Sequence, residues 1–370
     1  MPQFPLVDPI PPPAPIWLLK TLHNLTLALH LTSVELLLGG LLLGLIFSFW
    51  GRMQGSRDMV QASGMMAHRL PTLMAFVINL GVPPLLFAQV LYGRALYTSS
   101  VLIGAYWISV ILLLMASYYG LYAAAKRADQ RRSWSAPGFA ALLLVLTIAF
   151  IYSNNMTLML RPDAWLSMYR ISPNGVQLNT GDATLFPRWL FFITGAVPVS
   201  GAVLCLLALR PDASASVSRL LTRSGGIAMA LGIIVQSFWG WASWSAQPAG
   251  VASSVVKNAV YGASLYGWLA TAALMLLAGL FASVFSTARW TVAIACSLAA
   301  FLNVAATVMV RDGIRDATLQ AAGFDVWNRQ VDSNWSVIGL FLILFVAALA
   351  ALGYLALIVA KARRIEEKYV

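Results

Sequence analysis

Charged residues are few in this chain, and their scarcity excludes a soluble globular protein. Only 10% of its 370 residues are Asp, Glu, Lys or Arg, whereas 60% are hydrophobic and the mean hydropathy is +0.78. A soluble domain carries about 25% charged residues because its surface must face water. Most of this surface must therefore face the lipid bilayer or other membrane subunits.

Cysteine and histidine are also rare, with two and three residues respectively. Cys205 and Cys296 both lie within apolar runs, which is typical of small buried side chains. The sequence has no Cys-x-x-Cys-His, so no c-type haem is attached to this chain. It also has no Walker loop, HExxH or zinc-ligand spacing. We therefore do not expect a metal site with several centres.

Long apolar runs are what the sequence does have. A membrane-spanning helix needs about 20 predominantly apolar residues. The candidate spans cover residues 22–50, 70–93, 102–125, 136–158, 187–209, 225–246, 258–284, 289–309 and 335–360. This pattern predicts an all-α, polytopic transmembrane helical bundle of about nine helices. The mixed segment at 53–69 is predicted to be a short helix on the cytoplasmic surface.

The basic residues predict the orientation of the bundle. If the N-terminus lies outside and the C-terminus in the cytoplasm, 15 of the 24 basic residues fall on the cytoplasmic side and nine on the outer side. This is the bias expected of a bacterial inner-membrane protein. The bias also accounts for the net charge of +11 without any nucleic-acid partner.

The spans and loops divide the chain into six parts. The proline-rich segment 1–21 has no basic region before an apolar core, so we expect an extended outer segment and not a signal peptide. The remaining parts are helices one to four at 22–160, an outer loop at 161–186, helices five to eight at 187–309, a second outer loop at 310–334, and the last helix with a basic cytoplasmic tail at 335–370.

Three ionisable residues lie within the first span, where such residues are costly and are functional candidates. His23 and His30 are seven residues apart, on nearly one face and about 10 Å apart along the axis, so they cannot both ligate one metal ion. His30 could ligate a haem or form an interhelical hydrogen bond. His23 could ligate a second haem or be an interfacial residue. Glu35 lies about 140° around the helix from His30. It could accept a proton, hydrogen-bond a quinol, pair with a base on another helix or form an interhelical hydrogen bond.

Two further segments carry polar groups near the outer side. Trp239 belongs to the aromatic stretch SFWGWASWSA, which could be an interfacial belt or a quinone-head pocket with Gln236 or Lys257 as donors. The segment MVRDGIRDATLQ holds four charges between Arg311 and Asp316, at spacings that allow local ion pairs on a helix. Such a cluster is usually surface structure, but it could also dock a partner or a propionate group.

The first half of the chain carries motifs of one known family. His30 is followed by LTSVELLL and Gly39, and MAFVINLGVPPLLFAQVLYG holds Asn79, Gly81, Val82, Phe87 and Gly93. NNMTLMLRPDAW follows the fourth span. Over about the first 205 residues the chain resembles subunit I of cytochrome bd quinol oxidases, which also has nine helices and an outer N-terminus.

The resemblance implies a membrane subunit of a respiratory electron-transfer complex. It would bind one haem b through His30, or none, and could oxidise menaquinol or ubiquinol and pass electrons to an outer-face c-type cytochrome or iron–sulfur subunit. The family's second haem histidine would fall near Phe192, in FPRWLFFITGA, and GAYWISVILLLMASYYG lacks the family's paired glutamates. A three-haem oxygen-reducing site therefore cannot be built from this chain.

Two other functions fit the sequence. The chain could be a haem-free anchor that holds redox subunits at the outer face. It could also be a transporter, in which Pro83-Pro84 and Pro198 would break helices near the middle of the membrane.

Overall fold

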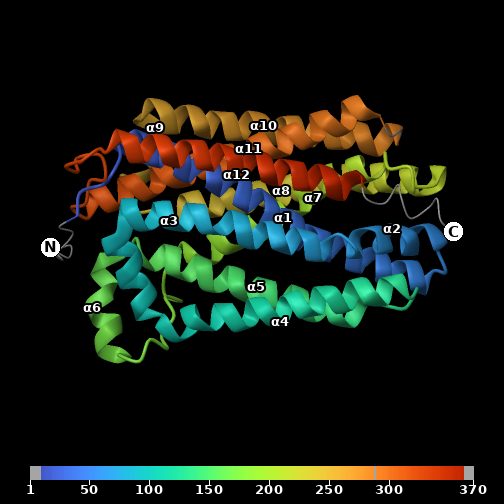
Figure 1. Cartoon of the computed structure of the whole chain (residues 1–370), viewed down its shortest axis with the longest axis horizontal. Coiled ribbons are helices and arrows are strands. Elements are labelled where there is room, and N and C mark those ends of the chain that lie inside the picture. Colours follow the sequence, from blue (N-terminus) through green and yellow to red (C-terminus); the bar gives the residue numbers. More distant parts are fainter. Residues whose placement is uncertain (1–9, 287–288, 362–370) are drawn as a thin grey trace.

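The computed structural model describes residues 10–286 and 289–361, and helices dominate this part of the chain (Figure 1). Nine helices in it are long and apolar enough to cross a membrane. They are α1 (Ile16–Met53), α3 (Leu70–Leu102), α4 (Gly104–Asp129), α5 (Ser135–Leu158), α7 (Leu185–Leu207), α8 (Ala215–Ser245), α10 (Ala259–Phe285), α11 (Trp290–Ala321) and α12 (Trp335–Lys361). The predicted helical membrane bundle is confirmed.

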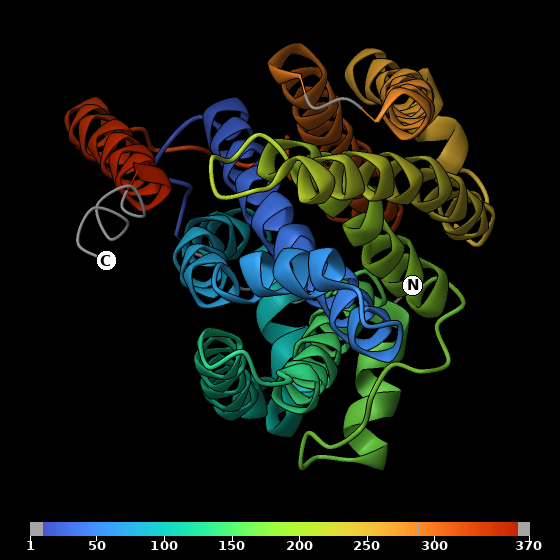
Figure 2. The same ribbon diagram turned by 90° about the vertical axis from the view of Figure 1, so that its right-hand side faces the viewer.

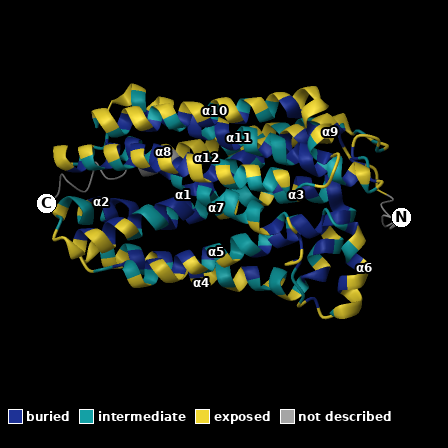
Figure 3. Ribbon diagram, turned by 180° about the vertical axis from the view of Figure 1, so that it is seen from behind, coloured by how far each residue is buried: buried dark blue, intermediate teal, exposed yellow. Residues whose placement is uncertain are grey.

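The long helices run alongside one another, and α1 begins at one end of the bundle whereas α12 finishes at the other (Figure 1). We call the end where α1 begins the outer end, after the orientation that the sequence predicts. In the end-on view α1 lies in the middle and α12 at the periphery (Figure 2). In the most apolar window of α1, 61% of residues are buried, against 6% in α12 (Figure 3). The rest of the bundle is therefore built around α1.

Three short helices complete the described fold. The helix predicted within 53–69 is present as α2 (Arg57–Ala67), and the Ser56 side chain caps it by accepting a hydrogen bond from the amide of Met59. The helices α6 (Pro162–Ile171) and α9 (Val251–Lys257) lie at the outer end. Asn258 then caps α10 in the same way, through the amides of Val260 and Tyr261. These polar caps satisfy amide groups that a helix start leaves without partners.

The prolines within the spans do not break their helices. The helix α3 continues through Pro83 and Pro84, and α7 continues through Pro198, so the sequence-based expectation of broken helices is wrong. The non-helical residue of α3 is instead Tyr92, with φ −130° and ψ 24°. Arg329 donates hydrogen bonds to the carbonyls of Val90 and Leu91 beside this kink. The outer loop before α12 thus supplies donors where the helix is irregular.

Glycines allow the backbones of α7, α8 and α10 to touch. A Cβ atom on Gly226 of α8 would lie 2.5 Å from the carbonyl oxygen of Gly279 on α10, and one on Gly201 of α7 would lie 2.6 Å from that of Gly225. Real Cβ atoms do not approach backbone oxygens so closely. Small residues commonly hold membrane helices together in this manner, because lipid supplies no hydrophobic force between helices.

We expect Gly226→Val to destabilise the protein by about 1–3 kcal/mol or more, because the new side chain must push α8 away from α10. Thermal unfolding of the purified protein in detergent measures this loss. Gly267→Val on α10 is the matched control, since nothing lies within 4 Å of a Cβ built there. Equal melting temperatures for the two variants would contradict the proposed backbone contact.

Candidate functional site

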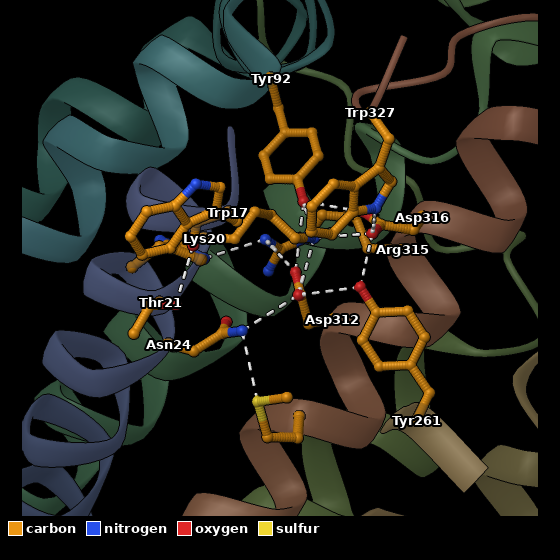
Figure 4. A network of polar contacts seen from close by, with 12 residues as sticks. Trp17, Lys20, Thr21, Asn24, Tyr92, Tyr261, Asp312, Arg315, Asp316 and Trp327 are labelled. Atoms are coloured by element: carbon orange, nitrogen blue, oxygen red, sulfur yellow. Dashed lines mark hydrogen bonds and ion pairs between the residues drawn. The ribbon is translucent and has the colours of Figure 1, made fainter. Parts of the chain in front are cut away.

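A buried lysine connects α1 to α11 at the outer end of the bundle. Lys20 is only 3% exposed, and its Nζ lies 2.7 Å from the carboxylate oxygens of both Asp312 and Asp316 (Figure 4). Asn24, one turn further along α1, donates a hydrogen bond of 3.1 Å to Asp312. A lysine buried among apolar helices requires such partners, because an unpaired charge there is costly.

Arg315 extends this network to the histidine of the first span. Its Nη1 lies 3.6 Å from Asp312 and 2.9 Å from His23 Nε2. The other ring nitrogen of His23, Nδ1, lies 3.0 Å from the carbonyl oxygen of Pro84. Arg315 can only donate and a carbonyl can only accept, so His23 carries its proton on Nδ1. Both nitrogens of His23 are engaged, which leaves neither for a metal ion.

Two tyrosines and a tryptophan complete the hydrogen bonding of the aspartates. Tyr92, at the kink of α3, donates to Asp316 at 2.9 Å and accepts from Lys20 at 2.7 Å. Tyr261 of α10 donates to Asp316 at 2.7 Å, and the indole of Trp327 donates to it at 2.9 Å. Two cations therefore face two carboxylates, and hydroxyl, amide and indole groups satisfy the remaining acceptors (Figure 4).

The structure corrects the sequence interpretation of the 311–316 cluster. We expected surface ion pairs, but Asp312 is 1% exposed and Arg315 is 5% exposed. The helix α11 continues to Ala321, well beyond the predicted span end at residue 309, and carries these charges inside the bundle. Their main partner, Lys20, comes from almost 300 residues earlier in the chain, so no local spacing could reveal the pairing.

A large cavity lies next to the network. It has a volume of about 930 Å³ and is lined mainly by apolar side chains of α1, α3, α5, α7, α8, α10 and α11. The cationic and imidazole groups of its wall are His23, His30, Arg188, Arg311 and Arg315. Val82 and Trp241 also line it although more than half of each side chain is exposed, so the cavity opens onto the apolar surface. A cavity of this size can hold a large lipophilic molecule.

His30 lines this cavity, and one of its ring nitrogens has no hydrogen-bond partner in the described parts of the chain. Its Nδ1 lies 3.1 Å from the carbonyl oxygen of Val77, which can only accept, so the proton is on Nδ1 and Nε2 carries a lone pair. The two histidines contact α3 in the same way, His23 at Pro84 and His30 at Val77. Because α1 and α3 are antiparallel, a step of seven residues forward on α1 corresponds to a step of seven residues back on α3. Gly81 makes room for the ring, since a Cβ there would lie 2.9 Å from His30 Cε1.

Two arginines of the cavity wall form no close ion pair among the described residues, although Asp182 and Asp312 act on Arg188 and Arg311 respectively at longer range. The guanidinium groups of Arg188 on α7 and Arg311 on α11 make no hydrogen bond or ion pair within the parts of the chain that the structure describes, whereas Arg315 is fully engaged. Like charges in an apolar wall repel one another. An anionic group of a bound molecule would offset this repulsion.

The other predicted site residues lie outside the cavity wall. Glu35 and Gln236 are both buried, one residue away from wall residues on α1 and α8. Trp239 is half-buried and packs edge-on against Phe238, and Lys257 is exposed at the end of α9. The sequence interpretation did not include Lys20, Tyr92, Tyr261 or Arg188. A lone lysine or arginine at the start of an apolar run is the signal that could have identified Lys20 and Arg188.

One ion pair at the outer end is local in sequence and more exposed than the Lys20 network. Arg161 and Asp163, beside the start of α6, lie 2.9 Å apart, and the Asp163 carboxylate is well exposed. The hydrogen bond to Asp163 raises the pKa of Arg161. This pair contrasts with the buried Lys20 network, because both of its side chains reach solvent, which screens the interaction.

The fold defines a polytopic helical membrane protein with a charged network and an apolar cavity at its outer end. It resembles the structure of a bd oxidase from Geobacillus thermodenitrificans, with a TM-score of 0.63 over 96% of this chain and 100% of that chain, at 13% sequence identity. No known protein family and no curated protein matches the sequence. The chain therefore has a fold like that of bd oxidase, and at this identity the likeness extends to the fold alone.

Replacing Asp312 should test the importance of the network. We expect Asp312→Ala to destabilise the protein by about 3–5 kcal/mol, because it removes a partner of the buried Lys20 and Arg315 charges. The measurement is thermal or denaturant unfolding in detergent. Asp163→Ala removes an exposed ion pair and should cost less than about 1 kcal/mol. A similar small effect for both variants would mean that the buried charges do not hold α1 and α11 together.

Proposed function

We propose that this chain is the membrane subunit of a respiratory electron-transfer complex and that its cavity holds one b-type haem. The observation that carries the proposal is the combination of the free His30 Nε2 with the unpaired Arg188 and Arg311 in one apolar wall. A b-type haem needs an apolar space for its ring, a nitrogen ligand for its iron and cations for its two propionates. The bd-oxidase-like fold supports the respiratory context.

Each group of the wall would have a distinct task. The Val77 carbonyl fixes the tautomer and orientation of His30, as outer hydrogen bonds do for metal-ligating histidines. Arg188 and Arg311 would bind the propionates, and the apolar residues would keep water away from the ring. When bound, a haem of this type carries one electron at a time. His23 cannot take the ligand role, because Arg315 and Pro84 occupy its two nitrogens.

A quinol is the second candidate for the same cavity, as electron donor or as occupant. The opening beside Val82 and Trp241 would admit a lipophilic molecule such as menaquinol or ubiquinol from the bilayer. A neutral quinol, however, leaves Arg188 and Arg311 without an anion, so we favour the haem. In either case an outer-face c-type cytochrome or iron–sulfur subunit would receive the electron. A haem-free anchor for such subunits needs no cavity with a free imidazole.

The haem proposal is tested by purification in a mild detergent followed by a pyridine haemochrome spectrum and extraction of bound quinones. We expect one haem b per chain, lost in His30→Ala. His68→Ala is the matched control, because His68 lies beside the end of α2 and pairs with Asp129, outside the cavity. Haem retained at full occupancy by His30→Ala would refute the assignment of the ligand. Quinone without haem would favour the second candidate.

The arginines of the cavity wall allow an independent test of the haem proposal, because one substitution should change protein stability and haem content in opposite directions. Arg311→Gln removes a partly buried charge that makes no close ion pair among the described residues and that Arg315 and Arg188 repel, so the cofactor-free protein should become more stable or stay unchanged. The same variant should retain less haem, because a propionate loses its cation. Melting temperature and haem content of the same preparations measure both effects. A loss of stability together with full haem content would show that Arg311 has a structural role instead.

A further inference from the structure

Glu35 lies in the interior of the bundle without a counter-ion. It is 3% exposed and lies near the middle of α1, away from the charged network at the outer end. Its carboxylate oxygen Oε2 has no hydrogen-bond partner among the described residues, and no ion pair involves it there. The hydroxyl of Ser200 points to the backbone carbonyls of Glu35 and Leu36, and so does not serve the carboxyl group.

Gln236 of α8 approaches the same place, and a glycine makes this possible. A Cβ atom on Gly195 of α7 would lie 2.9 Å from Glu35 Oε1 and 2.5 Å from Gln236 Nε2. The two side-chain ends therefore lie within about 5.4 Å of each other, the sum of these two distances. Gln236 is also 3% exposed, and its carbonyl oxygen Oε1 has no partner among the described residues either. The Glu35 carboxyl group and the Gln236 amide thus meet above Gly195, and each has one oxygen without a partner among the described residues.

A single proton can supply the donor that the two partnerless oxygens of Glu35 and Gln236 lack. An ionised carboxylate in an apolar interior without a cation costs several kcal/mol, and a buried acceptor without a donor adds to this cost. If Glu35 carries a proton, its charge disappears and its O–H can donate to Gln236 Oε1. A neutral acid that donates in this manner is a stable arrangement in an apolar site.

We propose that Glu35 and Gln236 form a proton-binding site, in which Glu35 is a neutral carboxylic acid and the Gln236 amide is turned so that its oxygen, in the place of Nε2, accepts a hydrogen bond from it. The site lies directly behind the cavity wall, because the neighbouring residues Val34, Ile233 and Ser237 line the cavity. Glu35 is therefore placed to hold a proton beside whatever redox group the cavity contains. The acid–amide pair itself does not depend on the proposed haem.

Infrared spectroscopy of the purified full-length protein tests the pair directly. The unaltered protein should show the C=O band of a protonated carboxylic acid that shifts in D2O, and Glu35→Gln should remove this band. Glu35→Gln preserves the shape of the side chain and can still donate to Gln236, so we expect it to fold with unchanged or higher melting temperature. Asp163→Asn is the control, because it should remove only a carboxylate signal from an exposed side chain.

A second variant tests the hydrogen bond to Gln236 separately from the protonation of Glu35. Gln236→Leu keeps the apolar volume but removes the acceptor, so the acid band should remain and move to the higher frequency of an unbonded carboxylic acid. A band that Gln236→Leu leaves unmoved would overturn the acid–amide pair. A carboxylate band that disappears in Glu35→Gln, and that responds to sodium in the unaltered protein, would overturn proton binding in favour of a bound cation. Because these spectra do not require haem, their failure is distinguishable from failure of the haem proposal.

Discussion

The pairing of Lys20 with Asp312 and Asp316 is the interaction on which the outer half of this protein depends. Each of these charges would be too costly to bury alone among apolar helices. Together with Arg315 they form a neutral group of two cations and two anions, enclosed by tyrosine, asparagine and tryptophan donors. The network joins α1 to α3, α10 and α11, so it fixes the central helix against the helices that form the cavity wall.

The contrast between paired and unpaired charges distinguishes structural from functional groups here. Arg315 and His23 use their polar atoms within the protein, whereas Arg188, Arg311 and the Nε2 of His30 belong to cavity-lining residues and make no side-chain hydrogen bond or ion pair among the described residues. In the proposed function a ligand would supply these partners. The site proposed at Glu35 follows the same reasoning, with a proton as the missing group.

Glycine residues allow polar side chains to pack closely both at the cavity wall and at the proposed proton site. Gly81 admits the ring of His30 to the cavity wall, and Gly195 admits Glu35 and Gln236 to each other. In each case a Cβ atom would occupy the space that a polar group now fills. Close packing of α7, α8 and α10 through further glycines holds these small spaces constant, which membrane helices achieve by van der Waals contact in the absence of a hydrophobic force.

The sequence alone determined the nine spans, because apolar length and the exclusion of charge from lipid are local properties that a window of residues contains. It also singled out His30 and Glu35, since an ionisable residue within an apolar run is conspicuous wherever it packs. Only the tertiary structure decided that Lys20 belongs to the 312–316 segment, that His23 is already engaged and that Arg188 and Arg311 lack partners. Those facts depend on which helices touch, and helices that contact each other across almost 300 residues leave no trace in local spacing.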